Sequence, residues 1–198
     1  MRTSYLWLMI TLLLAGCAGQ PSTVGKDPQP PSAMINQGEP DMSAAIAALE
    51  DGKPIVAEAL LRGLTQRYPH AGKPWANIGL ILFRRGEWNR AQQAAEKSLE
   101  LQPEIAAADY LLGLIAHKKN DAPQALKHYR SSLAKNPLHA HSHYNLALLY
   151  DTYYQDIEKA VHHYHRYLEL IQNEDEATLA WVKELESQII PDGGASDS

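Results

Sequence analysis

The sequence has very little cysteine: Cys17 is the only one among 198 residues. One thiol cannot close a disulfide within the chain, which excludes a disulfide-stabilised scaffold. The 12 glycines are scattered and form no phosphate-binding loop. Basic residues are outnumbered, 18 against 23 acidic, and the formal charge of −5 argues against binding a nucleic-acid backbone. No catalytic constellation is visible, so we predict neither an enzyme nor a cofactor site.

The apolar run at the N-terminus is too short to span a membrane. Residues 5–14 are almost wholly apolar and follow the single charge of Arg2. A spanning helix needs about 20 apolar residues, whereas a signal-peptide core needs roughly 7–15. We therefore predict that residues 1–16 form a signal peptide.

The four residues Leu14-Ala15-Gly16-Cys17 resemble the lipobox of bacterial lipoproteins. The resemblance implies cleavage before Cys17 and acylation of its thiol, and two or more acyl chains anchor a protein stably. The alternative is an ordinary secretory signal with a coincidental cysteine. By resemblance to Gram-negative sorting, Ala18 favours the outer membrane. We expect a protein of the bacterial cell envelope, held by a lipid anchor in the outer membrane and facing the periplasm.

Residues 17–37 have the composition of a linker. Four prolines lie among serine, threonine, glycine and glutamine, and no helical period is present. Such segments are flexible and partly extended. We predict that this stretch tethers the folded part to the lipidated Cys17.

A 34-residue repeat organises the rest of the chain. Gly79 recurs as Gly113, and Pro103 recurs as Pro137. Apolar residues at helical spacing on both sides of a turn predict a helical hairpin in each copy. The marker residues and the period resemble the tetratricopeptide repeat (TPR). The resemblance implies an all-α right-handed superhelix of four TPR hairpins plus a C-terminal capping helix. The four copies are 38–71, 72–105, 106–139 and 140–173.

Small residues at the hairpin crossings have a packing reason. We expect Gly79 and Gly113 on first helices to leave room for Ala91 and Ala125 on second helices, because bulkier groups would overpack the crossing. Prolines after the second helices end them.

The fourth copy is irregular. It carries one extra residue, which we place in a lengthened turn at 153–155. Asn173 is expected to cap a final helix at 174–190. That helix should cover the fourth repeat, as terminal capping elements do, and residues 191–198 should form a disordered tail.

A partner-binding groove follows from the TPR resemblance, because first helices line the concave face of such arrays. The matching positions form an apolar strip that becomes aromatic toward the C-terminus, suited to an extended segment or an amphipathic helix of a protein partner. The alternative is that these side chains only fill the hairpin core. The predicted groove residues are Met42, Ile46, Ala76, Leu80, Phe83, Tyr110, Leu114, Tyr144 and Leu148.

The function predicted from the sequence is that of a non-catalytic scaffold or adaptor. By family resemblance, the setting is assembly of an outer-membrane machine such as a pilus or secretion system, or recruitment of cell-wall enzymes. We predict no nucleic-acid partner, and membrane contact through the lipid alone.

Histidine carries the alternative function. Six of the nine histidines lie between 139 and 165. His139 and His143 are four apart and His162 and His165 three apart, so each pair shares a helix face. Facing pairs could hold a metal ion or respond to pH. The other interpretation, which we favour, is that they are polar residues at helix ends without a metal.

Overall fold

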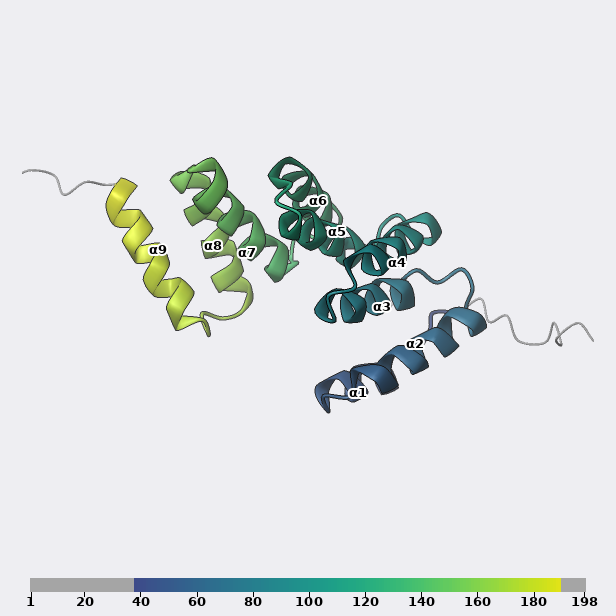
Figure 1. The fold of residues 1–198 in the computed structure, drawn as a ribbon. Coiled ribbons are helices and arrows are strands. Elements are labelled where there is room, and N and C mark those ends of the chain that lie inside the picture. The colour runs from purple at the N-terminus through teal and green to yellow at the C-terminus, as the bar shows by residue number, and fades with distance from the viewer. Residues whose placement is uncertain (1–37, 190–198) are drawn as a thin grey trace, which may run out of the picture. The chain divides into compact units, whose positions relative to one another are not determined.

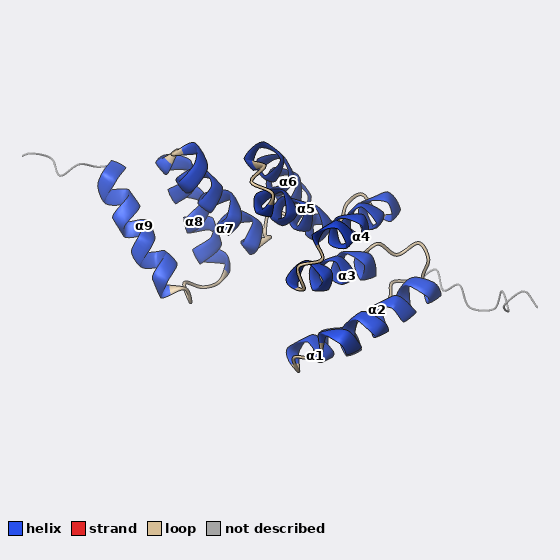
Figure 2. Cartoon of the chain, viewed as in Figure 1, coloured by secondary structure: helices blue, strands red, loops and turns tan. Residues whose placement is uncertain are grey.

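The structure is a computed structural model that describes residues 38–189, where every regular element is helical (Figure 2). The predicted signal peptide, the linker with Cys17 and the tail from 190 onward lie outside the described residues. Across 38–189 there is no helix with both the length and the apolar content needed to cross a membrane.

The helices follow the predicted hairpin pattern, two to each repeat. Second helices begin at residues 54, 88 and 122 and end at 67, 101 and 135, which reproduces the 34-residue period. The elements are α1 (Ser43–Glu50), α2 (Pro54–Arg67), α3 (Lys73–Arg84), α4 (Trp88–Leu101), α5 (Ala106–Lys118), α6 (Ala122–Lys135), α7 (Ala140–Leu149), the π-helix η1 (Tyr150–Tyr154), α8 (Ile157–Leu170) and α9 (Glu176–Ile189).

Each hairpin packs on the next one, from α1 and α2 at one end of the series to α9 at the other (Figure 1). One core cluster runs from α1 to α5 and includes Leu61, Ile78 and Leu111. A second runs from α5 to α9 and includes Tyr129 and Leu168. No hairpin buries its apolar face alone, so the array is stabilised by contacts between neighbours.

The glycines of the first helices make room for larger groups than the sequence predicted. A Cβ on Gly113 would lie 2.5 Å from Cε1 of Tyr129, so the nearest group of the second helix is this ring and not the predicted Ala125. A Cβ on Gly79 would lie 2.5 Å from Cδ2 of Leu111 in the next repeat, and 3.2 Å from the backbone oxygen of Ala91. The crossing depends on an aromatic ring and on the following repeat as well as on small residues.

The extra residue of the fourth repeat widens the end of its first helix. α7 continues into the π-helix at residues 150–154 instead of ending in the turn predicted at 153–155. A π-turn takes up one additional residue without breaking the helix. Gln155 then adopts φ 53° and ψ 35°, the left-handed conformation that reverses the chain into α8.

Asp175, not Asn173, caps the final helix. The Asp175 carboxylate accepts a hydrogen bond from the Thr178 backbone N–H at 3.0 Å. The backbone N–H of Asn173 instead donates to the Leu168 carbonyl at 2.8 Å and terminates α8. The prediction of Asn173 as the cap rests on the fact that asparagine is also a good N-cap residue. The structure uses Asn173 for its tolerance of positive φ, here 61°.

Candidate functional site

The predicted groove residues all lie on or next to first helices. Ala76 is buried, while Ile46 on α1 is 47% exposed. The other seven are partly buried. Met42 and Phe83 pack against the N-terminal core cluster, and Tyr110, Leu114 and Tyr144 against the C-terminal one. These side chains therefore both support the hairpins and leave part of their surface open.

The aromatic half of the predicted strip is joined by rings from other positions. The Tyr110 ring lies 4.9 Å from the ring of His139 and stacks at 27° on that of His141, with centroids 6.2 Å apart. Tyr144 contacts Tyr167 of α8, with ring centroids 5.0 Å apart. We call these five residues the aromatic strip. The sequence did not identify Tyr167 of α8 as part of this surface, because its spacing matched the apolar face of a helix that packs in the core.

Burial affects the chemistry of Tyr110. It raises the pKa of the phenol, although a hydrogen bond with the Asn145 side chain and the charge of Arg84 act in the opposite direction. The hydroxyl therefore stays protonated near neutral pH and offers a hydrogen-bond donor beside an apolar ring. Tyrosine is common at the centre of protein interfaces because it combines these two properties.

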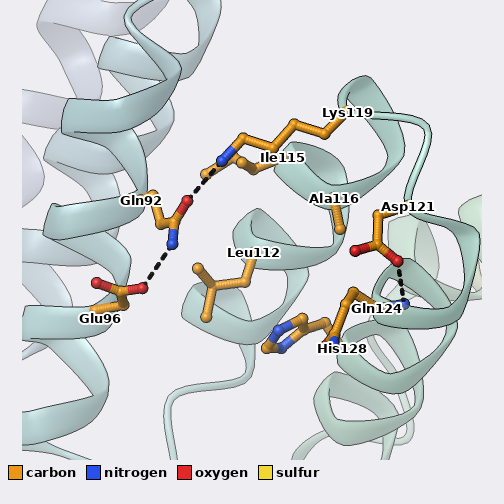
Figure 3. Close-up of a pocket in the computed structure, with 9 residues that line it drawn as sticks. All are labelled: Gln92, Glu96, Leu112, Ile115, Ala116, Lys119, Asp121, Gln124 and His128. Atoms are coloured by element: carbon orange, nitrogen blue, oxygen red, sulfur yellow. Dashed lines mark hydrogen bonds between the residues drawn. The ribbon is translucent and has the colours of Figure 1, made fainter.

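Crevices also lie between successive second helices. One of about 380 Å³ opens between α4 and α6 above α5 (Figure 3). Leu112, Ile115 and Ala116 form its floor. Along its rim Lys119 donates to Gln92, and Gln92 donates to Glu96, each at 2.8 Å. Those polar groups are already paired with one another.

A second crevice, of about 340 Å³, occupies the equivalent place one repeat earlier. Trp75, Ile78 and Leu82 lie beneath Arg62 and Arg90. Its two arginines are engaged with Glu58 and Glu87. Neither crevice is lined by a predicted groove residue, so both follow from repeat geometry and not from the aromatic strip.

A buried carboxylate joins the two helices of the third repeat. Asp109 on α5 is 4% exposed and accepts hydrogen bonds from Ser131 at 2.9 Å, from Lys135 and from His128. Burial by itself would raise the pKa of Asp109, but these hydrogen bonds and the Lys135 charge hold it below its ordinary value of 3.8. Asp109 is thus ionised and satisfied, which is the pattern of a structural ion pair. Spacing did not reveal this network because its members come from two helices.

The histidines are paired differently from the prediction. His143 Nδ1 lies 3.0 Å from His163 Nδ1, across the α7–α8 interface. His165 contacts Glu186 of α9 at 2.8 Å, and His139 Nδ1 accepts a hydrogen bond from the Ser142 backbone at the start of α7. Among the residues that the structure describes, no three histidine, cysteine or acidic side chains are placed to share a metal ion.

The hydrogen atoms of the His143–His163 pair can be assigned. His143 Nε2 is 3.1 Å from the Pro137 carbonyl oxygen, which only accepts, so Nε2 carries a hydrogen. Neutral His143 then has its lone pair on Nδ1 and accepts from His163 Nδ1–H. Burial lowers the pKa of both rings, and for His163 the charges of His143, His162 and Arg130 lower it further, to about 4.

Comparisons with known proteins agree with this geometry. A family profile described as tetratricopeptide repeat matches residues 76–132 and 118–152. A search of curated proteins found no significant match.

Solved structures share the fold at low sequence identity. MamA (41-end) from Desulfovibrio magneticus RS-1 is 22% identical, with a TM-score of 0.53 over 81% of this chain and 100% of that one. A thermophilic TPR protein of Thermus thermophilus is 18% identical, with a TM-score of 0.58 over 72% and 77% of the two chains. A chain of the APC/C hetero-tetramer Cut9-Hcn1 is 18% identical, with a TM-score of 0.59 over 71% and 28%. The predicted all-α fold class is confirmed, and residues 76–152 of this chain match the tetratricopeptide-repeat profile.

Proposed function

We propose that this protein is a lipid-anchored adaptor of the bacterial cell envelope that docks a partner protein on its aromatic strip. The observation that carries the proposal is the strip itself, in which the Tyr110 ring contacts those of His139 and His141 and the Tyr144 ring contacts that of Tyr167. A row of aromatic groups held by a rigid scaffold favours an extended or helical segment of another protein. Structures with the same fold include components of the Naa15/Naa10–HypK and Cut9–Hcn1 assemblies.

The anchor is proposed from the lipobox-like residues ending in Cys17. Acylation there would place the repeats on the periplasmic side of the outer membrane, at the end of the proline-containing linker. Assembly of a pilus or secretion machine, or recruitment of cell-wall enzymes, would both use such an adaptor. The role is non-catalytic in this proposal.

The anchor can be tested by metabolic labelling. In a bacterial host fed radiolabelled palmitate, the full chain should incorporate label and fractionate with membranes. Cys17→Ser should lose essentially all of the label, because no other thiol is present in the sequence. Equal labelling of both forms would contradict lipidation at Cys17. Processing without label would indicate an ordinary secretory signal.

The groove can be tested with a photocrosslinking amino acid. p-Benzoylphenylalanine in place of Tyr110 or Tyr144 keeps an aromatic group at each site, and crosslinking in intact cells should yield one discrete partner adduct from both positions. Trp88 on α4 is the matched control, since it is an aromatic residue 41% exposed on a second helix. Adducts from Trp88 together with none from the strip would show that the partner binds another face.

A further inference from the structure

The two ends of the repeat array differ in what covers them. At the C-terminal end, α9 buries Val182 and Leu185 against the fourth repeat. Trp181 Nε1 donates to the Asp151 carboxylate at 2.8 Å and holds α9 to the π-helix. The outer side of α9 carries exposed Lys183 and Glu184 as well as Trp181, 45% exposed, and Ile189, 37% exposed. α9 is the terminal helix that covers the last repeat of the array.

The N-terminal end exposes more apolar surface. Ile55 is 76% exposed, Val56 48% and Leu60 40%, all on α2. In the part of the chain that the structure describes, no helix covers them. Several large apolar side chains exposed to water on a terminal repeat indicate a surface that binds another helix or protein.

The repeat fold does not require this apolar surface. In the next repeat, the positions equivalent to Val56 and Ala59 are Arg90 and Gln93. Both of these α4 residues are polar and at least partly exposed. Apolar residues at these two positions are therefore particular to α2.

Gly63 adds a second, independent sign. It lies within α2, where glycine costs about 1 kcal/mol relative to alanine. A Cβ at this position would meet nothing within 4 Å. Packing among residues 38–189 therefore gives no reason for the glycine, whereas a helix packed against this face of α2 could approach closely where the side chain is missing. Ile55, Ala59, Gly63 and Arg67 are spaced by four and lie on the outer side of α2, so they form one ridge along it.

We propose that this ridge is the interface of a homodimer, in which α2 packs antiparallel on α2 of a second copy. With the two-fold axis at Ala59, each Ile55 lies opposite Gly63 of the second copy, so that a large side chain fills the space left by a missing one. A surface that is complementary to itself in shape is what an isologous contact needs.

A chain that begins at Ala18 provides the test, because it contains all of the compact unit 35–198 and no cysteine. Sedimentation velocity should give a dimer for this chain and a monomer for Ile55→Glu. The matched control is Leu138→Glu, which adds the same charge at a site 65% exposed between α6 and α7 and should remain dimeric. Circular dichroism melting checks that both variants stay folded.

The register is tested with a single introduced thiol. Ala59→Cys should form an intermolecular disulfide on mild oxidation, because two copies of residue 59 meet on the axis. Glu184→Cys, at an exposed position on α9, should stay reduced.

Three results would overturn the proposal. The first is a monomeric parent chain at about 100 times the concentration used for the variants. The second is a dimer that Ile55→Glu leaves intact, which would place the contact elsewhere. The third is a chain from residue 38 that dimerises while the chain from Ala18 does not, which would show that the chain's own linker covers α2.

Discussion

Replacing Tyr129 with alanine should lower the free energy of unfolding by about 3–5 kcal/mol, the usual cost of truncating a buried aromatic residue. Its side chain is completely buried in the C-terminal core cluster. The ring fills the space beside Gly113, with Tyr110 on another side at 6.2 Å between centroids. Urea unfolding followed by circular dichroism measures the change.

Tyr129→Phe separates the ring from its hydroxyl. The hydroxyl oxygen is buried and has no hydrogen-bond partner in the structure. Burying an unpaired hydroxyl costs about 1–3 kcal/mol, so phenylalanine should leave stability unchanged or raise it. A loss of more than about 1 kcal/mol in Tyr129→Phe would mean that the hydroxyl is paired in solution.

The contact with Gly113 predicts coupling between the two sites. Gly113→Ala should destabilise the parent chain by about 1–2 kcal/mol, because the overpacking against Tyr129 exceeds the gain in helix propensity. In the Tyr129→Ala background the same change should be neutral or stabilising. Additive effects in the double-mutant cycle would show that the two residues do not touch.

Lowering the pH from 7 to 4.5 should reduce the free energy of unfolding by about 2–3 kcal/mol through His163 alone, since each unit of pKa difference is worth about 1.4 kcal/mol. The folded protein lowers the pKa of His163 from 6.5 to about 4. Below the unfolded pKa the unfolded chain therefore binds a proton that the folded chain does not. The contribution of His163 to stability is full above about pH 6.5, falls as pH decreases toward 4, and levels off there.

Burial is the main cause of the lowered pKa of His163, and the pair with His143 adds to it. The hydrogen bond between His143 Nδ1 and His163 Nδ1 needs a lone pair on one of the two rings, so a doubly charged pair would set two N–H groups against each other 3.0 Å apart. The His163 ring also stacks on Tyr150, with centroids 5.8 Å apart and planes 4° from parallel. Solvent therefore has little access to stabilise a charge on it.

His163→Gln should flatten this pH dependence by the same 2–3 kcal/mol or so, measured from urea midpoints at half-unit intervals of pH. His141→Gln is the matched control, because His141 is exposed on α7 and outside the pair. If both variants kept the parent slope, the acid sensitivity would come from groups other than the His143–His163 pair. The pH-responsive part of the alternative function rests on this pair.

Local signals in the chain were enough to predict the period, the hairpins and their ends. The second helices end two residues before Pro69, Pro103 and Pro137 because proline disfavours a helical conformation in the residue before it. The positions that line the first helices could also be named, since the repeat fixes which face they occupy. The contacts that those side chains make could not be predicted from the repeat.

Packing between helices decided the contacts that join distant residues. Gly113 needs space for Tyr129, 16 positions further on, and His143 meets His163 instead of a neighbour on its own helix. The π-turn carries Asp151 to Trp181 of α9, 30 residues away. The spacing of residues along one helix predicts which side chains share a face of that helix. Which side chains meet across two helices depends on the angle at which the helices cross, and the volumes of the packed side chains set that angle. For the same reason, the unused space at Gly63 became visible only in the folded chain.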